Sequence, residues 1–179
     1  MPLNIIRNDI SKVSADAIVN SANPEVAIGE GVDSTIYEAA GAEKLFAERE
    51  KIGKMKPGQA AVTPAFDLDA KYIIHTVGPV WHGGNHGEPE LLSNCYYNSL
   101  IQAKRNGIRS IAFPAISTGV YGYPIREAAK RAIRAVVHTL DADPDNFDRV
   151  VFVMFSERDR EVYEAVRDEY YSNFSYLWE

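Results

Sequence analysis

The chain has 179 residues, of which 46% are hydrophobic and 25% are charged, and its formal net charge is −6. This length and composition are typical of one globular domain and exclude a disordered or low-complexity chain. The acidic balance excludes an overall positive field that would attract nucleic acid or an anionic membrane, so any phosphate site has to be built locally. We therefore expect residues 1–179 to form a single domain, with neither nucleic acid nor a membrane as its partner.

A single cysteine, Cys95, leaves no internal disulfide and is consistent with a reducing compartment. The first residues lack the basic and apolar segments of a signal peptide, and no apolar run approaches the length of a membrane span. These features predict a cytoplasmic protein.

Short β-rich runs alternate along the chain with longer stretches of helical periodicity, the pattern of a layered α/β domain. Several of the runs are apolar almost throughout, which is typical of strands covered on both faces. The predicted strands are Leu3–Arg7, Ala17–Asn20, Ala60–Thr63, Tyr72–Val77, Ser110–Pro114 and Arg149–Phe155.

Three stretches place apolar side chains on one face of a helix, and these helices are expected to pack on the sheet. Residues 170–179 form an aromatic tail, which is expected to dock on the protein, with a partner surface as the alternative. The three predicted faces are Leu92, Cys95, Tyr96, Ser99 and Ala103; Ala129, Ala132, Ile133, Val136 and Leu140; and Val162, Ala165, Val166, Glu169 and Tyr170. The tail contains Tyr170, Tyr171, Phe174, Tyr176, Leu177 and Trp178.

The first candidate site follows the second predicted strand, where Asn20–Asn23 and Gly29–Asp33 precede a helix that begins near Val32. Glycines let the main chain approach a ligand closely, and a helix N-terminus offers N–H groups to an anion. Asp33 would then be a lone carboxylate beside an anion site, or simply a first-turn acid that complements the helix dipole. The asparagines are also common turn residues.

The second candidate site is Ser117–Tyr123, which joins an apolar strand to Pro124, a residue suited to the first helical position. Its glycines and hydroxyl groups could form a phosphate nest, or merely a tight connection. No Gly-Lys-Ser or Gly-Lys-Thr occurs in the chain, which disfavours kinase or NTPase chemistry.

The third candidate site lies at the ends of the last and first strands. Phe155 would either stack on a base or belong to the core. Asp9 would either accept a hydrogen bond from an exocyclic amine or cap the following turn.

The histidines and the cysteine have structural interpretations. Cys95 lies on a buried helix face, and Gly83–Gly84 prevents the helix that would align His82 with His86 as metal ligands. His75 lies inside an apolar strand and is expected to be a hydrogen-bonded core imidazole.

Together these loops resemble the macro domain family of ADP-ribose-binding proteins, and the resemblance runs to about Tyr170. Five segments carry it in the family's order: Asn8–Ser11, Ile18–Asn23, Gly31–Asp33, Tyr72–Pro79 and Pro114–Gly122. The resemblance implies a three-layer α/β/α sandwich with a mixed, roughly six-stranded sheet. It is strongest to the hydrolytic branch that includes O-acetyl-ADP-ribose deacetylases.

Carried over residue by residue, the resemblance implies that Asp9 accepts the adenine amino group and that Phe155 stacks on adenine. The diphosphate would lie between the first two candidate loops, and Asn23 would bind the distal ribose. The implied ligand-binding residues are Asp9, Ile10, Asn20, Gly29, Glu30, Gly31, Val32, Ser117, Thr118, Gly119, Val120, Tyr121, Gly122, Tyr123 and Phe155.

The implied reaction is hydrolysis of an ester at the distal ribose, either in O-acetyl-ADP-ribose or in ADP-ribose attached to a protein carboxylate. Asp33 and Asn23 are the implied catalytic residues. Water would be positioned by Asp33 and by a phosphate oxygen of the substrate, a route that requires no cofactor, metal or covalent intermediate.

Two positions depart from the hydrolytic branch: Glu30 interrupts its usual run of glycines, and Tyr37 stands where a histidine is common. Glu30 would weaken binding if it points inward and change little if it points to solvent. The alternatives are a non-catalytic reader of ADP-ribose, which would bind without turnover, and a phosphatase for ADP-ribose-1''-phosphate.

Overall fold

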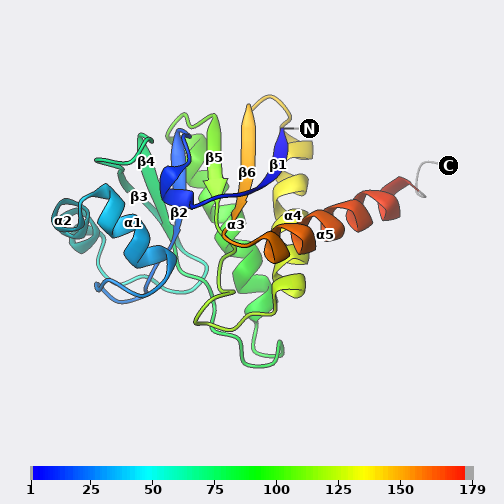
Figure 1. Ribbon diagram of the computed structural model, residues 1–179, viewed down its shortest axis with the longest axis horizontal. Coiled ribbons are helices and arrows are strands. Elements are labelled where there is room, and N and C mark those ends of the chain that lie inside the picture. Colours follow the sequence, from blue (N-terminus) through cyan, green and yellow to red (C-terminus); the bar gives the residue numbers. More distant parts are fainter. Residues whose placement is uncertain (1, 176–179) are drawn as a thin grey trace.

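The computed structural model describes residues 2–175, which form a mixed six-stranded sheet covered by helices on both faces (Figure 1). The strand order is β1-β6-β5-β2-β4-β3, with β3 antiparallel to β4 and the other neighbours parallel. The predicted strands are confirmed, with ends that move by at most one residue. They are β1 (Leu3–Arg7), β2 (Ala17–Ser21), β3 (Ala60–Pro64), β4 (Tyr72–Thr76), β5 (Ser110–Phe113) and β6 (Arg149–Met154).

The helices form the two outer layers of an α/β/α sandwich, as expected. The layer of α1 and α2 packs with the short 3-10 turn Ile10–Lys12 over one face of the sheet, while α3, α4 and α5 pack with the other. The helices are α1 (Val32–Ala40), α2 (Ala42–Ile52), α3 (Glu88–Arg105), α4 (Ile125–Ala142) and α5 (Glu157–Ser175).

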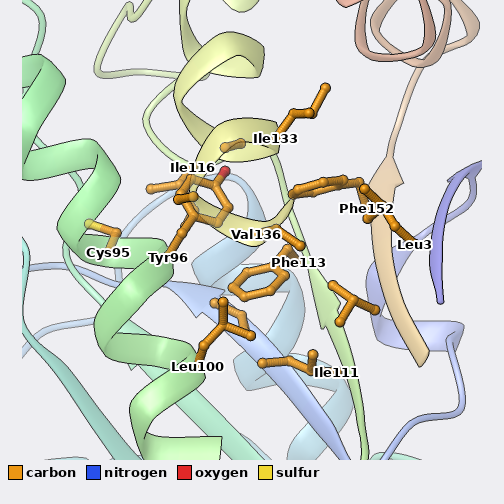
Figure 2. Close-up of a cluster of buried hydrophobic side chains, with 14 of the residues drawn as sticks. Leu3, Cys95, Tyr96, Leu100, Ile111, Phe113, Ile116, Ile133, Val136 and Phe152 are labelled. Atoms are coloured by element: carbon orange, nitrogen blue, oxygen red, sulfur yellow. The ribbon is translucent and has the colours of Figure 1, made fainter. Parts of the chain in front are cut away.

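The larger core cluster lies between the sheet and α3 and α4 (Figure 2). Tyr96 of α3 meets the strand residues Phe113 and Phe152 at ring-centroid distances of 5.1 and 6.0 Å. Phe152 in turn meets Tyr163 of α5 at 5.4 Å. Tilted aromatic contacts of this kind add to the free energy gained by burying the rings. The predicted buried faces of α3 and α4 are confirmed throughout.

The predicted face of α5 is partly wrong. Tyr163 and Val166 are its buried residues, whereas Ala165 and Glu169 are exposed. Only part of α5 covers the sheet, because the helix extends beyond it into solvent (Figure 1). Of the aromatic tail, Tyr170 is half-buried against the larger core cluster. The side chain of Phe174 and the residues Tyr176, Leu177 and Trp178 lie outside the described part of the chain.

Parallel pairing brings the carboxyl ends of β1, β6, β5, β2 and β4 to one edge of the sheet. The candidate loops therefore lie side by side, where open α/β sheets bind ligands. Within residues 2–175, no helix has both the length and the apolar character needed to cross a membrane.

Candidate active site

A cavity of about 360 Å³ lies at the carboxyl ends of β2 and β5, between the first two candidate loops. It brings together most of the predicted residues of these loops. Asn20, Thr118, Gly122 and Tyr123 do not line it, and Ser21, Ala22 and Ala115 are additional lining residues. The full lining is Ser21, Ala22, Asn23, Gly29, Glu30, Gly31, Val32, Asp33, Ala115, Ser117, Gly119, Val120 and Tyr121.

Asp33 is the second residue of α1, and its carboxylate is held from outside that helix. The Nδ2 of Asn20 donates to Oδ1 at 2.7 Å, and the main-chain N–H of Gly29 donates to Oδ2 at 2.6 Å. The residue is only 3% exposed, and burial raises the pKa of its carboxyl although both hydrogen bonds lower it. A buried carboxylate at a cavity wall is a candidate for accepting a proton from a bound ligand. Asp33 bonds to Asn20 and Gly29 outside α1, so its contacts extend beyond those of a first-turn acid.

Glycine is needed at positions 29 and 31, just before α1, for two different reasons. Gly31, which caps α1, has φ +69°, a conformation that side chains rarely adopt. A Cβ on Gly29 would lie 3.3 Å from Oδ2 of Asp33, so glycine leaves room for the close main-chain contact.

A buried chain of hydrogen bonds fixes the amide that binds Asp33. Thr63 donates its hydroxyl hydrogen to the carbonyl of Pro64, so its oxygen accepts from Nε2 of His75 at 3.0 Å. Nδ1 of His75 is then an acceptor, and Nδ2 of Asn20 donates to it at 3.1 Å. Burial lowers the pKa of His75 to about 3, so the ring stays neutral. The expected core imidazole is confirmed, and the chain links β3, β4 and β2 to Asp33.

The loop after β5 lines the cavity with Ser117, Gly119, Val120 and Tyr121. Thr118, Gly122 and Tyr123 use their N–H groups within the loop. The N–H groups of Gly119 and Val120 have no acceptor among the described residues, so they are available to an anion.

The loop is anchored from two sides. Ser117 has φ +67°, and its Oγ would lie 2.0 Å from a Cβ on Gly78, so the close approach requires glycine at that position. Tyr123 is buried against Trp81 at a ring-centroid distance of 4.5 Å. Pro124 precedes α4 as its N-cap and is not its first helical residue, because its ψ of 128° is extended.

Phe155 and Asp9 lie apart from the cavity, at the ends of the neighbouring strands β6 and β1. Phe155 is 81% exposed, so the core interpretation is wrong. Asp9 accepts at Oδ1 from the N–H and the hydroxyl of Ser11, at 2.9 and 2.7 Å, which is the capping interaction. Ile10 is buried beneath them in the smaller cluster.

The two positions that depart from the hydrolytic branch differ in exposure. Glu30 is exposed at the rim of the cavity. Tyr37 is buried behind Asp33, and burial, aided by the charge of Asp33, raises its pKa to about 12. Tyr37 therefore stays protonated.

Asn23 uses its side chain and its main chain in different contacts. Its Oδ1 accepts from the N–H of Glu25 at 3.0 Å, the expected turn interaction. Its carbonyl accepts from Nη2 of Arg49 at 3.1 Å. Arg49 is not among the predicted site residues, because it lies in a run of charged residues on α2. The available signal is its position four residues after Leu45, on the same face of the helix.

The cysteine and the loop histidines lie where their structural interpretations placed them. Cys95 is fully buried, and burial raises the pKa of its thiol to about 11. His82 and His86 lie in a loop, not on a helix. That loop is ordered by Glu88, whose carboxylate accepts three main-chain N–H bonds. The described residues contain no group of three or more side chains suited to holding a metal ion.

Comparison with known proteins agrees with this geometry. The family model of the macro domain matches residues 19–132. The chain belongs to the macro domain family. A macro domain-containing protein of Chlorobaculum tepidum is 50% identical over 168 residues, which cover 92% of this chain and 96% of that protein. An O-acetyl-ADP-ribose deacetylase of Cronobacter turicensis is 44% identical over 171 residues, covering 94% and 97%.

Solved structures show the same fold. The Oceanobacillus iheyensis macrodomain with ADP has a TM-score of 0.87 and 38% identity to this macro domain, covering 96% of this chain and 92% of that one. The Trypanosoma brucei macrodomain in complex with ADP-ribose has a TM-score of 0.86 and 35% identity, covering 92% and 68%. The three-layer fold implied by the resemblance is confirmed.

Proposed function

We propose that this macro domain binds ADP-ribose along the strand-end edge and hydrolyses an ester at the distal ribose. The observation that carries the proposal is Asp33, a buried carboxylate held by two donors at the wall of a ligand-sized cavity. A domain that only recognised ADP-ribose would not need a desolvated carboxylate there, because such a group disfavours an anionic ligand.

The strand order supports the path of the ligand. Phe155 follows β6, the loop with Gly119 follows β5, and Asp33 follows β2, and these strands are neighbours in that order. Adenine would stack on Phe155 and bond to Asp9, the diphosphate would lie over β5, and the distal ribose would lie over β2. The three parts of ADP-ribose thus match three sites in a row.

The diphosphate would be held by main-chain groups. The free amides of Gly119 and Val120 and the N-terminus of α1 at Val32 face the same cavity. Helix N-termini and amide nests attract phosphate without any lysine. This accounts for anion binding by a chain of net charge −6.

The reaction follows from the position of Asp33. A water molecule bound to the carboxylate, and oriented by a phosphate oxygen of the substrate, attacks the acyl carbon of the ester. Asp33 accepts the proton of the water, the bond between the acyl carbon and the ribose oxygen breaks, and the ribose oxygen leaves and regains a proton. Asn23 would bind the ribose beside the reacting ester.

The test is a substrate panel with the wild-type protein. ADP-ribose is titrated by calorimetry, and product release is measured from O-acetyl-ADP-ribose, from a protein mono-ADP-ribosylated on carboxylates, and from ADP-ribose-1''-phosphate. The proposal predicts binding and release from the first two substrates. Binding without any release would make the chain a reader, and phosphate release alone would make it a phosphatase.

A further inference from the structure

Arg49 is a buried cation that no carboxylate contacts. It lies near the end of α2 and is 2% exposed. Its guanidinium donates to the carbonyl of Gly53 through Nη1 and to the carbonyl of Asn23 through Nη2, the latter at 3.1 Å. No Asp or Glu oxygen lies within salt-bridge distance of it in the described part of the chain. Burying a charge in this way is costly unless another charge in the interior balances it.

Asp33 is a buried carboxylate close to the residue that Arg49 binds. A Cβ on Gly29 would lie 3.3 Å from Oδ2 of Asp33 and 3.6 Å from Nδ2 of Asn23, and Asn23 is the residue whose carbonyl accepts from Arg49. The positive charge of Arg49 lowers the pKa of Asp33, in opposition to burial. The same charge lowers the pKa values of Tyr37 and His75, two buried groups near Asp33.

The other groups that face Asp33 carry no positive charge. Asn20 of β2 and the main chain of Gly29 are neutral donors. Tyr37 of α1 and Tyr121 of the loop after β5 are protonated phenols, and Asp33 raises the pKa of each. His75 of β4 is neutral and touches Asp33 only through Asn20. Glu30, at the cavity rim, adds a negative charge. Arg49 is therefore the cation available to Asp33 among the described residues.

We propose that Arg49 is a positioning residue of the active site: it holds the main chain under Asn23 and supplies the buried positive charge that balances Asp33. The assignment rests on the proposed function for its catalytic meaning, because Asp33 must be ionised to accept a proton from water. Arg49 would then fix the position of Asn23, which is proposed to bind the ribose, and favour the ionised form of Asp33.

The consequence for pH dependence has a definite sign. A base works in its ionised form, so turnover rises as the pH rises through the pKa of Asp33. Without Arg49, burial is less opposed and that pKa moves up. The acid limb of the kcat profile is then displaced to higher pH, while KM changes less.

The test uses Arg49→Gln, Arg49→Lys and the control Lys51→Gln, which removes a positive charge two residues away on the exposed side of α2. The side-chain carboxyl carbon of Asp33 is titrated by NMR in each protein without substrate, and kcat is measured against pH with O-acetyl-ADP-ribose. We expect the pKa of Asp33 to rise in Arg49→Gln and to stay near the wild-type value in the other two variants. An unchanged titration in Arg49→Gln, or an equal shift in Lys51→Gln, overturns the proposal.

The NMR readout separates this inference from the proposed function. If the wild-type protein shows no turnover, the proposed hydrolysis fails, yet the titration still decides whether Arg49 balances Asp33. If Arg49→Gln does not fold, it is combined with Asp33→Asn. Recovery of folded protein supports charge balance, because the unpaired buried anion has been removed, and no recovery contradicts it.

Discussion

Glu30 places a carboxylate at the rim of the cavity that we assign to a diphosphate. An exposed like charge near a ligand anion weakens binding modestly and is screened by salt. Glu30→Gln is therefore expected to raise the affinity for ADP-ribose by about two- to fivefold at low salt. The gain should shrink in about 1 M salt, where the Debye length is about 3 Å. Calorimetry at the two salt concentrations measures both effects.

Glu161→Gln is the matched control, since Glu161 is exposed on α5 and far along the chain from the cavity loops. An equal gain in that variant, or no gain in Glu30→Gln, would show that Glu30 points away from the bound ligand.

Phe155 exposes 81% of its surface, so it contributes little to the core. Stacking of a base on an aromatic ring contributes about 1–3 kcal/mol, and Phe155→Ala is expected to weaken ADP-ribose binding by about 5- to 150-fold. The thermal unfolding midpoint should hardly change. Ile101→Ala removes another exposed apolar side chain, on α3, and should leave the affinity unaltered. Equal affinities of wild type and Phe155→Ala would show that adenine does not stack on Phe155.

The sequence predicted that Phe155 follows the last strand and that Asp33 follows a glycine-containing loop at the start of a helix. It left two interpretations open for each, because exposure and hydrogen bonding depend on residues far apart in the chain. Arg49 was not predicted. Its position four residues after Leu45 places it on the buried face of α2, but its contact with the carbonyl of Asn23 depends on how α2 packs against that loop.

Among the elements, the hydrogen bonds from Thr63 through His75 to Asn20 connect three adjacent strands to the carboxylate of Asp33. Thr63→Val removes the acceptor for Nε2 of His75 and frees the ring to change tautomer, which would turn Asn20 away from Asp33. We expect a loss of stability of about 1–3 kcal/mol and a lower kcat with little change in KM. Urea unfolding and steady-state kinetics measure the two effects.

Thr139→Val is the control for that experiment, because Thr139 bonds a main-chain carbonyl within α4. If Thr63→Val lowers stability but leaves kcat at the Thr139→Val level, the strand network supports only the fold.

Substitutions of Gly78 and Gly119 test how closely the loop after β5 packs against its neighbours. A Cβ on Gly78 would lie 2.0 Å from Oγ of Ser117 and 2.7 Å from Ile116, whereas a Cβ on Gly119 meets nothing within 4 Å. Gly78→Ala is expected to cost about 1–3 kcal/mol of stability, and Gly119→Ala almost none. Differential scanning calorimetry compares them, and equal stabilities would contradict the close seating of Ser117.

The strands were predictable to within one residue because their apolar runs are bounded by polar turns. The face of α5 was not, since the buried side of the helix passes through Tyr163 and Val166 and not through Ala165 and Glu169. Ala165 is exposed although it lies next to the buried Val166, so its exposure reflects the side of the helix on which it lies.

In the molecule as a whole, the carboxyl ends of five parallel strands bring separate loops to one edge of the sheet. There the loops offer main-chain N–H donors, although the chain is acidic. The family's order of motifs made this architecture predictable before any coordinates. The cavity volume and the buried charge pattern were not predictable, because they depend on the packing of side chains from both outer layers.

We propose that Asp33 activates water in this cavity. This role is measured by single-turnover hydrolysis of O-acetyl-ADP-ribose with excess enzyme, comparing wild type and Asp33→Asn at equal occupancy set by calorimetry with ADP-ribose. We expect a rate lower by about 10²- to 10⁴-fold in Asp33→Asn, with affinity changed only slightly. The smallest expected loss is about 10²-fold. If Asp33→Asn binds ADP-ribose and still hydrolyses the ester at a rate within about tenfold of wild type, Asp33 does not activate the water.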